Sequence, residues 1–410
     1  MPRKTAEPEI ILDLSRLLSR VFHATPTGVD RCEMAYARGL LKAVPDRLRF
    51  AAVHPGGLYG RIPTAAVVRF LDATEDRWDH RGFSSAWDMR RFATSALAAM
   101  RPRLHRRDPA APRPFYLQAS PNNLTRPKLV ASILERERAR FVCLVHDLIP
   151  LQYPEYAREG GAALHEIRVR TILAHAEGVI CNSQATLDAL TPWMERTGRF
   201  PEAMVAHLGT HAHRISGDMP PPASVSDGRP YFVCIGTIEP RKNHLLLLNI
   251  WRRMSEERGA ANTPKLILVG RRGWENEQVV DMLERCPGLK GCVEERGRLT
   301  DRDVADLLPG ARALLMPSFA EGYGMPVAEA LSLGVRVVCS NLPALREAGG
   351  DNAIYLDPLD GLGWQATIEQ QANEPLYGTQ ATHEFREPPS WTGHIAIVLE
   401  MLRRLTPEQS

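Results

Sequence analysis

The sequence has few of the features that mark membrane, secreted or nucleic-acid-binding proteins. No run of apolar residues approaches the roughly 18 that a membrane-spanning helix needs. The N-terminal residues are polar and lack the apolar core of a signal peptide. The formal net charge of +3 is too small to indicate a nucleic-acid partner. With 44% hydrophobic and 24% charged residues, the composition favours an ordinary globular protein of the cytoplasm.

The missing motifs exclude further kinds of site. The seven cysteines are an odd number and contain no Cys-x2-Cys pair, so we expect buried thiols rather than disulfides or a zinc site. A dinucleotide-dependent dehydrogenase would need Gly-x-Gly-x-x-Gly after its first strand. No such motif follows Ile10–Leu12 or Tyr231–Ile235.

The chain of 410 residues is organised as two α/β halves. Residues 213–229 have the Pro, Ser and Gly content of a linker. We expect a first domain over residues 1–212, a second over 230–385, and a C-terminal helix within 386–410. Strands are predicted in the first half at Glu9–Asp13, Arg49–Val53, Phe115–Gln118, Arg140–Val145 and Gly178–Asn182.

The most informative stretch is residues 319–334, which read FAEGYGMPVAEALSLG. It lies between two strand-like runs, Ala311–Met316 and Val335–Ser340, and so indicates a βαβ unit of a parallel sheet. Its loop is then at the carboxyl end of a strand, where open α/β sheets bind their ligands.

The residue types of this loop predict a nucleotide-sugar site. Gly322 and Gly324 allow φ > 0 and leave backbone N–H groups uncovered, and Pro326 suits a first helical turn. Such a helix N-terminus attracts phosphate. Glu321 and Glu329 are suited to accept hydrogen bonds from hydroxyls on either side of a diphosphate. The alternative is a surface loop with two solvated glutamates.

In this setting Glu-x7-Glu resembles the retaining, nucleotide-sugar-dependent glycosyltransferases of family four, the glycosyl transferases group 1. The resemblance implies the GT-B fold, with two Rossmann-like parallel-sheet domains facing a central cleft and a last helix that crosses back to the first domain. It implies that Glu321 holds the donor hexose and Glu329 the ribose. The implied donor site also includes Gly322, Tyr323, Gly324, Met325 and Pro326.

A second segment, residues 231–244, supports the first. The apolar run Tyr231–Ile235 predicts a strand that Gly236 ends, and Arg241 and Lys242 fall in the turn before the next helix. These cations suit a diphosphate leaving group. The family's lysine is matched by Lys242. Many members carry an arginine after the strand glycine, where this chain has Thr237, so we take Arg241 as its substitute. The alternative is a pair of solvated basic residues.

The resemblance continues toward the nucleotide base. Pro264–Gly270 predicts the next strand, which Arg271 follows. Residues 297–301 resemble the loop that lies against the base, with backbone groups of Arg298 and Leu299 meeting its edge. Thr300 and Asp303 form a capping box that opens a helix.

The first half is expected to supply the acceptor side. His146 ends the run Phe141–Val145, and the wording around it resembles a bacterial surface-polysaccharide branch of the family, in which a histidine here faces the donor sugar. Asp147 is expected to cap a turn, and Ser183 to cap a helix. The Gly28 loop is read either as a neighbour of the diphosphate, with Asp30 or Arg31 toward the acceptor, or as a tight turn.

Residues 90–107 combine arginines with apolar residues. They predict either a basic amphipathic helix that touches an anionic membrane or a solvated basic face. The apolar members are Phe92, Leu97, Met100 and Leu104.

The sequence as a whole predicts a cytoplasmic hexosyltransferase, peripheral on the inner membrane face in the first of these two readings. A hexose, first of all mannose from GDP-mannose, moves with retention to a glycan or lipid-linked glycan in polysaccharide biosynthesis. Lys242, Arg241 and the helix N-terminus stabilise the leaving diphosphate without a metal or cofactor. Two alternatives remain open: a nucleotide-sugar hydrolase or epimerase of the same fold, and a non-catalytic sugar-binding protein.

Overall fold

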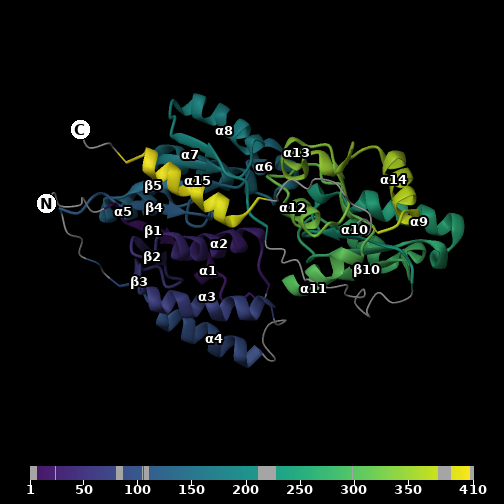
Figure 1. Ribbon diagram of the computed structural model, residues 1–410, viewed down its shortest axis with the longest axis horizontal. Helices are drawn as coiled ribbons and strands as arrows, with labels where there is room; N and C mark the ends of the chain where they lie inside the picture. Colours follow the sequence, from purple (N-terminus) through teal and green to yellow (C-terminus); the bar gives the residue numbers. More distant parts are fainter. Residues whose placement is uncertain are drawn as a thin grey trace. The chain divides into compact units, whose positions relative to one another are not determined.

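A computed structural model describes residues 7–23, 25–79, 86–103, 105, 110–210, 228–297, 299–376 and 389–406. Contacts within the chain divide it into two compact units (Figure 1). Unit 1 comprises residues 1–151, 160–208 and 390–410, and unit 2 comprises 152–159 and 209–389. The expected linker, residues 213–229, lies outside the described residues except for its last two positions. The short segment 152–159, which the sequence assigned to the first domain, belongs to unit 2.

Unit 1 is built on a seven-stranded sheet of the order β3-β2-β1-β4-β5-β6-β7. Its strands are β1 (Ile10–Asp13), β2 (Leu48–Val53), β3 (Tyr59–Ile62), β4 (Phe115–Gln118), β5 (Arg140–Val145), β6 (Ala176–Cys181) and β7 (Glu202–Val205). The central strands are continuous apolar runs because helices cover both faces of a parallel sheet. The pairs are parallel, except that β3 runs antiparallel to β2 at the edge.

The helices of unit 1 fill the connections between these strands. They are α1 (Ser15–Ser19), α2 (Gly28–Ala43), α3 (Thr64–Asp79), α4 (Ala86–Ala99), α5 (Pro127–Glu137), α6 (Ile149–Gln152), α7 (Gly161–His175), α8 (Gln184–Thr197) and α15 (Trp391–Arg404). Ser183 caps α8 as predicted, because its side chain accepts a hydrogen bond from the Thr186 N–H.

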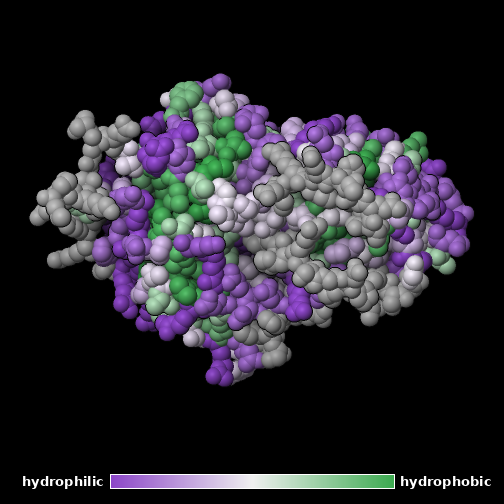
Figure 2. Space-filling model, in the orientation of Figure 1, coloured by the Kyte–Doolittle hydropathy of each residue, from purple (hydrophilic) through white to green (hydrophobic). Residues whose placement is uncertain are grey.

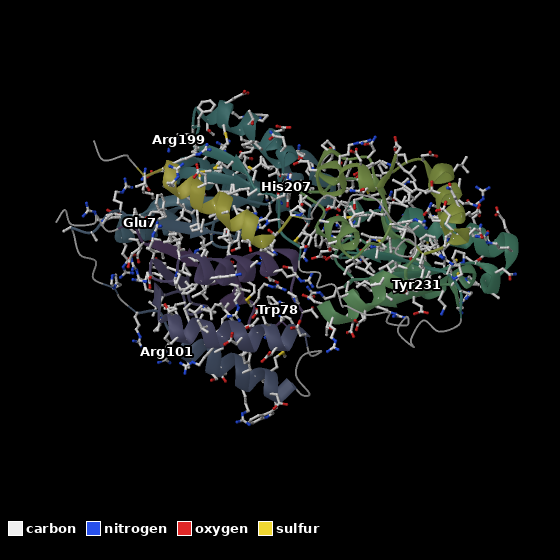
Figure 3. All side chains as sticks on the ribbon, in the orientation of Figure 1. Glu7, Trp78, Arg101, Arg199, His207 and Tyr231 are labelled. Carbon is white, nitrogen blue, oxygen red and sulfur yellow. The ribbon has the colours of Figure 1, made fainter. Side chains whose placement is uncertain are left out.

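The last helix packs on unit 1 although it follows unit 2 in the chain. Gly39 of α2 lies so close to Ile395 that an added Cβ would come within 2.6 Å of Ile395 Cγ1. The buried His394 ring makes two further contacts: its Nδ1 donates to the carbonyl oxygen of His207 at 3.1 Å, and its Nε2 is 2.7 Å from the Tyr36 hydroxyl. Figure 3 labels His207 beside this helix.

Unit 2 is a parallel six-stranded sheet of the order β10-β9-β8-β11-β12-β13. The strands are β8 (Tyr231–Ile235), β9 (Lys265–Val269), β10 (Val293–Arg296), β11 (Leu314–Met316), β12 (Val337–Ser340) and β13 (Ile354–Leu356). The helices are α9 (His244–Arg258), α10 (Glu277–Arg285), α11 (Asp301–Leu307), α12 (Met325–Ser332), α13 (Pro343–Gly349) and α14 (Gly361–Asn373).

Both faces of this sheet are covered. On one face Phe232, Leu247 and Trp251 share a core with Trp364 of α14. On the other, Val233, Leu314 and Val327 form a second core with Leu345 of α13. The predicted βαβ unit is confirmed, since α12 connects the parallel neighbours β11 and β12.

Apolar residues of the segment for which the sequence left a membrane-facing helix or a solvated basic face pack inside unit 1. The apolar residues of α4 and its end are used for packing, with Phe92 stacked on Phe70 at 6.4 Å between ring centroids and Met100 fully buried. Arg90, Arg91, Arg101 and Arg103 are exposed, whereas Leu104, Arg106 and Arg107 lie outside the described residues. The surface over α4 is mostly hydrophilic in Figure 2. Among the described residues, no helix is long and apolar enough to cross a membrane.

Candidate functional site

The site in unit 2 lies where two neighbouring strands end. β8 and β11 pair in parallel, so the loops that follow them leave the sheet at the same edge. The first loop contains a short 3-10 turn, Pro240–Lys242, and the second carries Glu321. The Phe319 N–H donates to the Arg241 carbonyl at 2.7 Å, which ties the two loops together.

Glu321 is held between two cations. Its Oε1 accepts a hydrogen bond from Lys242 Nζ at 2.6 Å, and its Oε2 accepts one from an Arg241 terminal nitrogen at 2.9 Å. The side chain of Glu321 is 7% exposed and that of Lys242 10%. The predicted residues Glu321, Lys242 and Arg241 are therefore brought together, 79 residues or more apart in the sequence.

A second carboxylate, Glu239, completes the cluster. Its Oε1 lies 2.6 Å from Arg241 Nε, and its side chain is 3% exposed. Arg241 also donates to the Ala320 carbonyl at 2.8 Å. The guanidinium that we took as a phosphate ligand is thus engaged by Glu239, Glu321 and a backbone oxygen.

The two carboxyl groups have opposite pKa shifts. Burial alone would raise the pKa of Glu321, but the charges of Lys242 and Arg241 outweigh it and lower the pKa to about 2. Burial raises the pKa of Glu239, which the charges of Arg241 and Lys242 offset only in part. Glu321 is therefore a permanent anion at neutral pH, well suited to accept hydrogen bonds from sugar hydroxyls.

Two glycines let the strand ends approach closely. Gly236 follows β8 and Gly270 follows β9, with φ of 152° and 157°. A Cβ on Gly270 would lie 1.8 Å from the Gly236 carbonyl oxygen, and one on Gly236 would lie 3.2 Å from Lys242 Cε. Gly236 therefore leaves room for the lysine that reaches Glu321. Thr237, where many relatives carry arginine, is half-buried beside Gly273.

The loop before α12 is shaped by one glycine rather than two. Gly324 caps the helix at φ 105°, whereas Gly322 does not use the positive φ that glycine allows. Pro326 lies in the first turn as predicted, Tyr323 is buried, and Met325 begins the helix. Glu329 is half-buried on the second turn of α12, eight residues after Glu321.

The residues predicted to meet the nucleotide base are not part of the cluster around Glu321. Arg271 is exposed at the end of β9, where its carbonyl accepts from the Ile238 N–H at 2.9 Å. Leu299 is half-buried and packs against the core. Arg298 lies outside the described residues. The capping box of Thr300 and Asp303 at the start of α11 is confirmed.

His146 and Gly28 belong to unit 1. Nε2 of His146 is 2.8 Å from the Ala119 carbonyl, an acceptor that requires the proton on Nε2. Burial lowers the pKa of His146, so the imidazole is neutral at pH 7. Asp147 caps a turn as expected, since it accepts from the Ile149 N–H at 3.1 Å.

Gly28 opens α2 without a left-handed φ, which favours the plain-turn reading of its loop. The N-terminus of α2 has a capping box in which Asp30 accepts from the Thr27 N–H. Asp30 is buried and forms ion pairs with Arg16 and Arg20.

Glu239 is the member of this cluster that the sequence analysis missed. Glu239 precedes Pro240, and Arg241 and Lys242 follow in the same turn. An acidic residue so close to two basic residues in the sequence could have indicated an ion pair. No group of three or more His, Cys, Asp or Glu side chains able to hold a metal occurs among the residues that the structure describes. All seven cysteines are free.

Comparisons with known proteins find similarity over the segment that carries this site. Residues 229–373 match the family model described as glycosyl transferases group 1. This segment is therefore similar to the group 1 glycosyl transferases. Its boundaries enclose Gly236, Lys242, Glu321 and Glu329, and so the whole cluster described above.

The curated relatives that the chain matches include proteins named as mannosyltransferases. The chain is 29% identical over 268 residues to the serotype-specific mannosyltransferase WbdA of Escherichia coli, with 60% of this chain and 32% of the relative covered. It is 38% identical over 152 residues to O-antigen chain mannosyltransferase B of Escherichia coli, with 37% and 39% covered. The chain thus spans about a third of the length of these relatives.

The fold is shared more widely than the sequence. The structure of Anabaena HepE in complex with UDP-glucose superimposes with a TM-score of 0.59 at 16% identity, covering 97% of this chain and 98% of the other. Together with the two α/β units, this likeness shows that the chain has the GT-B fold.

Proposed function

We propose that this protein is a retaining hexosyltransferase that uses a nucleoside diphosphate sugar. The carrying observation is the buried contact of Glu321 with Lys242 and Arg241 at the shared edge of β8 and β11, within the family segment. A carboxylate kept ionised in a buried site is an acceptor for sugar hydroxyls, and the adjacent α12 N-terminus is suited to phosphate.

The residues of unit 2 divide the work between the two ends of the donor. Glu321 binds hydroxyls of the hexose, and Glu329 on α12 binds those of the ribose. Lys242 and the N-terminus of α12 stabilise the negative charge that develops on the diphosphate. Arg241, fixed by Glu239, orients Glu321 and adds to the positive potential of the site.

The reaction is front-face displacement with retention. The bond between the anomeric carbon and the diphosphate oxygen breaks, and the acceptor oxygen bonds to the same face. The departing phosphate oxygen takes the acceptor proton. No metal or cofactor is required, because the cationic charge comes from the protein.

Mannose from GDP-mannose is the proposed donor, and a glycan or lipid-linked glycan the acceptor. The support is that the matched relatives are named as mannosyltransferases, two of them of O-antigen chains. We place the reaction in the cytoplasm at the inner membrane face. Contact with anionic lipid would use the exposed Arg90 and Arg91 with Trp87, whose side chain is also exposed, rather than the packed apolar face of α4.

The test measures nucleoside diphosphate release from a panel of nucleotide sugars, with and without a lipid-linked glycan acceptor and with and without EDTA. Transfer predicts release that depends on the acceptor, that is fastest with GDP-mannose, and that survives EDTA. Proton NMR of the product should show the anomeric configuration of the donor. Release that ignores the acceptor would instead identify a hydrolase, and binding without release a sugar-binding protein.

A further inference from the structure

Arg168 of α7 is a half-buried cation for which the described residues supply no partner. Its Nε is fully buried and has no hydrogen-bond acceptor, and the guanidinium forms no ion pair with the part of the chain that the structure describes. By contrast Arg170, two residues further along, pairs with Glu166 at 2.7 Å and is exposed. A buried charge without a counter-charge destabilises the fold, so its presence points to an anion that comes from outside the chain.

The surroundings of Arg168 are at the ligand-binding edge of the unit 1 sheet. His165, one turn earlier on the same face of α7, holds this helix to the loop after β5, since its Nε2 is 3.1 Å from the Asp147 carbonyl. Arg16 is on α1, directly after β1. Because β1 and β5 both flank β4 in parallel, their carboxyl ends meet at one edge.

Two arginines at this edge are held by one carboxylate. Arg16 and Arg20 share the single carboxylate of Asp30, at 2.6 and 2.8 Å. One terminal nitrogen of Arg20 is buried without a partner among the described residues. Asp147 is the acidic group near Arg168, and it forms no ion pair with it.

The electrostatics of the two arginines agree with this placement. The pKa of Arg168 is lowered, mainly by burial and also by the positive charge of Arg16. The negative charge of Asp147 opposes this shift. The charge of Arg16 also contributes to lowering the pKa of His146, after burial. Arg16, Arg168 and His146 therefore lie within electrostatic reach of one another.

We propose that Arg168, together with Arg16, binds a phosphate group carried by the acceptor substrate. A guanidinium fork matches the geometry of phosphate oxygens, and the charges of two guanidinium groups suit its double charge. The assignment to the acceptor rests on the proposed function, in which unit 2 takes the diphosphate of the donor. The same chemistry would hold free inorganic phosphate, and the experiment separates the two sources.

The test compares the full chain with Arg168→Gln and with Arg170→Gln, the matched control on the same helix. Calorimetry measures binding of inorganic phosphate, of glycerol 3-phosphate as a phosphate monoester, and of glycerol, at constant ionic strength set with chloride. Binding of GDP and UDP to each variant is measured in parallel. Melting temperatures without ligand are recorded for all three proteins.

Arg168→Gln should weaken phosphate binding about tenfold or more, with GDP and UDP binding unchanged and Arg170→Gln like the wild type. Its melting temperature without ligand should equal or exceed that of the wild type, because an unpaired half-buried charge is removed. Tighter binding of glycerol 3-phosphate than of inorganic phosphate assigns the group to the acceptor, and the reverse order to the free anion. Equal phosphate binding by Arg168→Gln and the wild type would overturn the site. Absence of GDP and UDP binding in every variant would instead count against the proposed function.

Discussion

Lys242 Nζ lies 2.6 Å from Glu321 Oε1, although the two residues are separated by 79 positions in the sequence. The contact forms because the strands before them, β8 and β11, are neighbours in the sheet and end at the same edge. It places a cation and an anion side by side where a nucleotide sugar is expected. The roles proposed for them differ, and the difference can be measured.

Removal of Lys242 should affect chemistry more than binding. In Lys242→Ala we expect kcat for hexosyl transfer to fall by about 100-fold or more, because a pre-placed positive charge no longer meets the departing diphosphate. In Glu329→Ala we expect KM for the donor to rise roughly tenfold with a smaller change in kcat, since ribose contacts are made equally in ground and transition states. Steady-state kinetics with varied donor measures both.

The control for these variants is Lys290→Ala, which removes an exposed lysine of unit 2. It should leave kcat and KM as in the wild type. Equal and mild effects of Lys242→Ala and Glu329→Ala would contradict the division of roles.

Glu321 should make folding stability depend on pH in the acid range. Its pKa in the folded protein is about 2, below the 4.5 of a free glutamate, so its contribution is complete above pH 4.5 and is lost as pH falls toward 2. This shift corresponds to about 3 kcal/mol. Urea unfolding should therefore show a large loss of stability in Glu321→Gln at pH 7 and a much smaller one near pH 3.

Glu275→Gln, an exposed position of the same unit, serves as the comparison. We expect it to leave the free energy of unfolding unchanged at both pH values. A Glu321→Gln variant whose deficit is the same at pH 7 and pH 3 would show that the carboxylate is not held by the two cations.

The sequence predicts this site well where local pattern decides it. The run before Glu321, the glycine at 324 and Pro326 specify strand, turn and helix through their own conformational preferences. The same holds for the capping residues Thr300 and Ser183. Glu321 and Lys242 could be paired in advance only through the family resemblance, because their contact depends on the order of strands in the sheet.

Features that depend on distant neighbours were not predictable. β3 is four residues long with only two apolar side chains, so nothing in its own sequence marks an antiparallel edge strand. In the sequence Arg168 looks like any exposed basic residue of a helix, and the charges that act on it, Asp147 and Arg16, come from other elements of the fold. The surroundings of a charged side chain are a tertiary property, whereas its helix is a local one.

His244, the first residue of α9, should cost stability rather than add it. The side chain is 1% exposed, and neither ring nitrogen has a hydrogen-bond partner in the described ranges. Burial and the charge of Lys242 lower its pKa to about 4. We expect His244→Leu to raise the free energy of unfolding by about 1–2 kcal/mol at pH 7, because an unsatisfied buried polar group is removed.

The stability difference between His244→Leu and the wild type should depend on pH. The unfolded chain takes up a proton at this histidine near pH 6.5 and the folded chain only near pH 4, so stability falls as pH drops between these values. His244→Leu should therefore gain more over the wild type at pH 5 than at pH 7. His105→Gln, at an exposed position, should leave the profile unchanged.

Gly270 should tolerate no side chain. A Cβ there would lie 1.8 Å from the Gly236 carbonyl oxygen, and φ of 157° is strained for any other residue. Because both neighbours are backbone at the ends of buried strands, neither can move aside without disturbing the turn that carries Lys242. We expect Gly270→Ala to lower the free energy of unfolding by at least about 3 kcal/mol, measured by urea titration.

Gly288→Ala, where an added Cβ meets no atom closer than 3.6 Å, should change the free energy of unfolding little. Similar losses in the two variants would mean that the strand ends are farther apart than this, and that Gly236 and Gly270 do not set the position of Lys242.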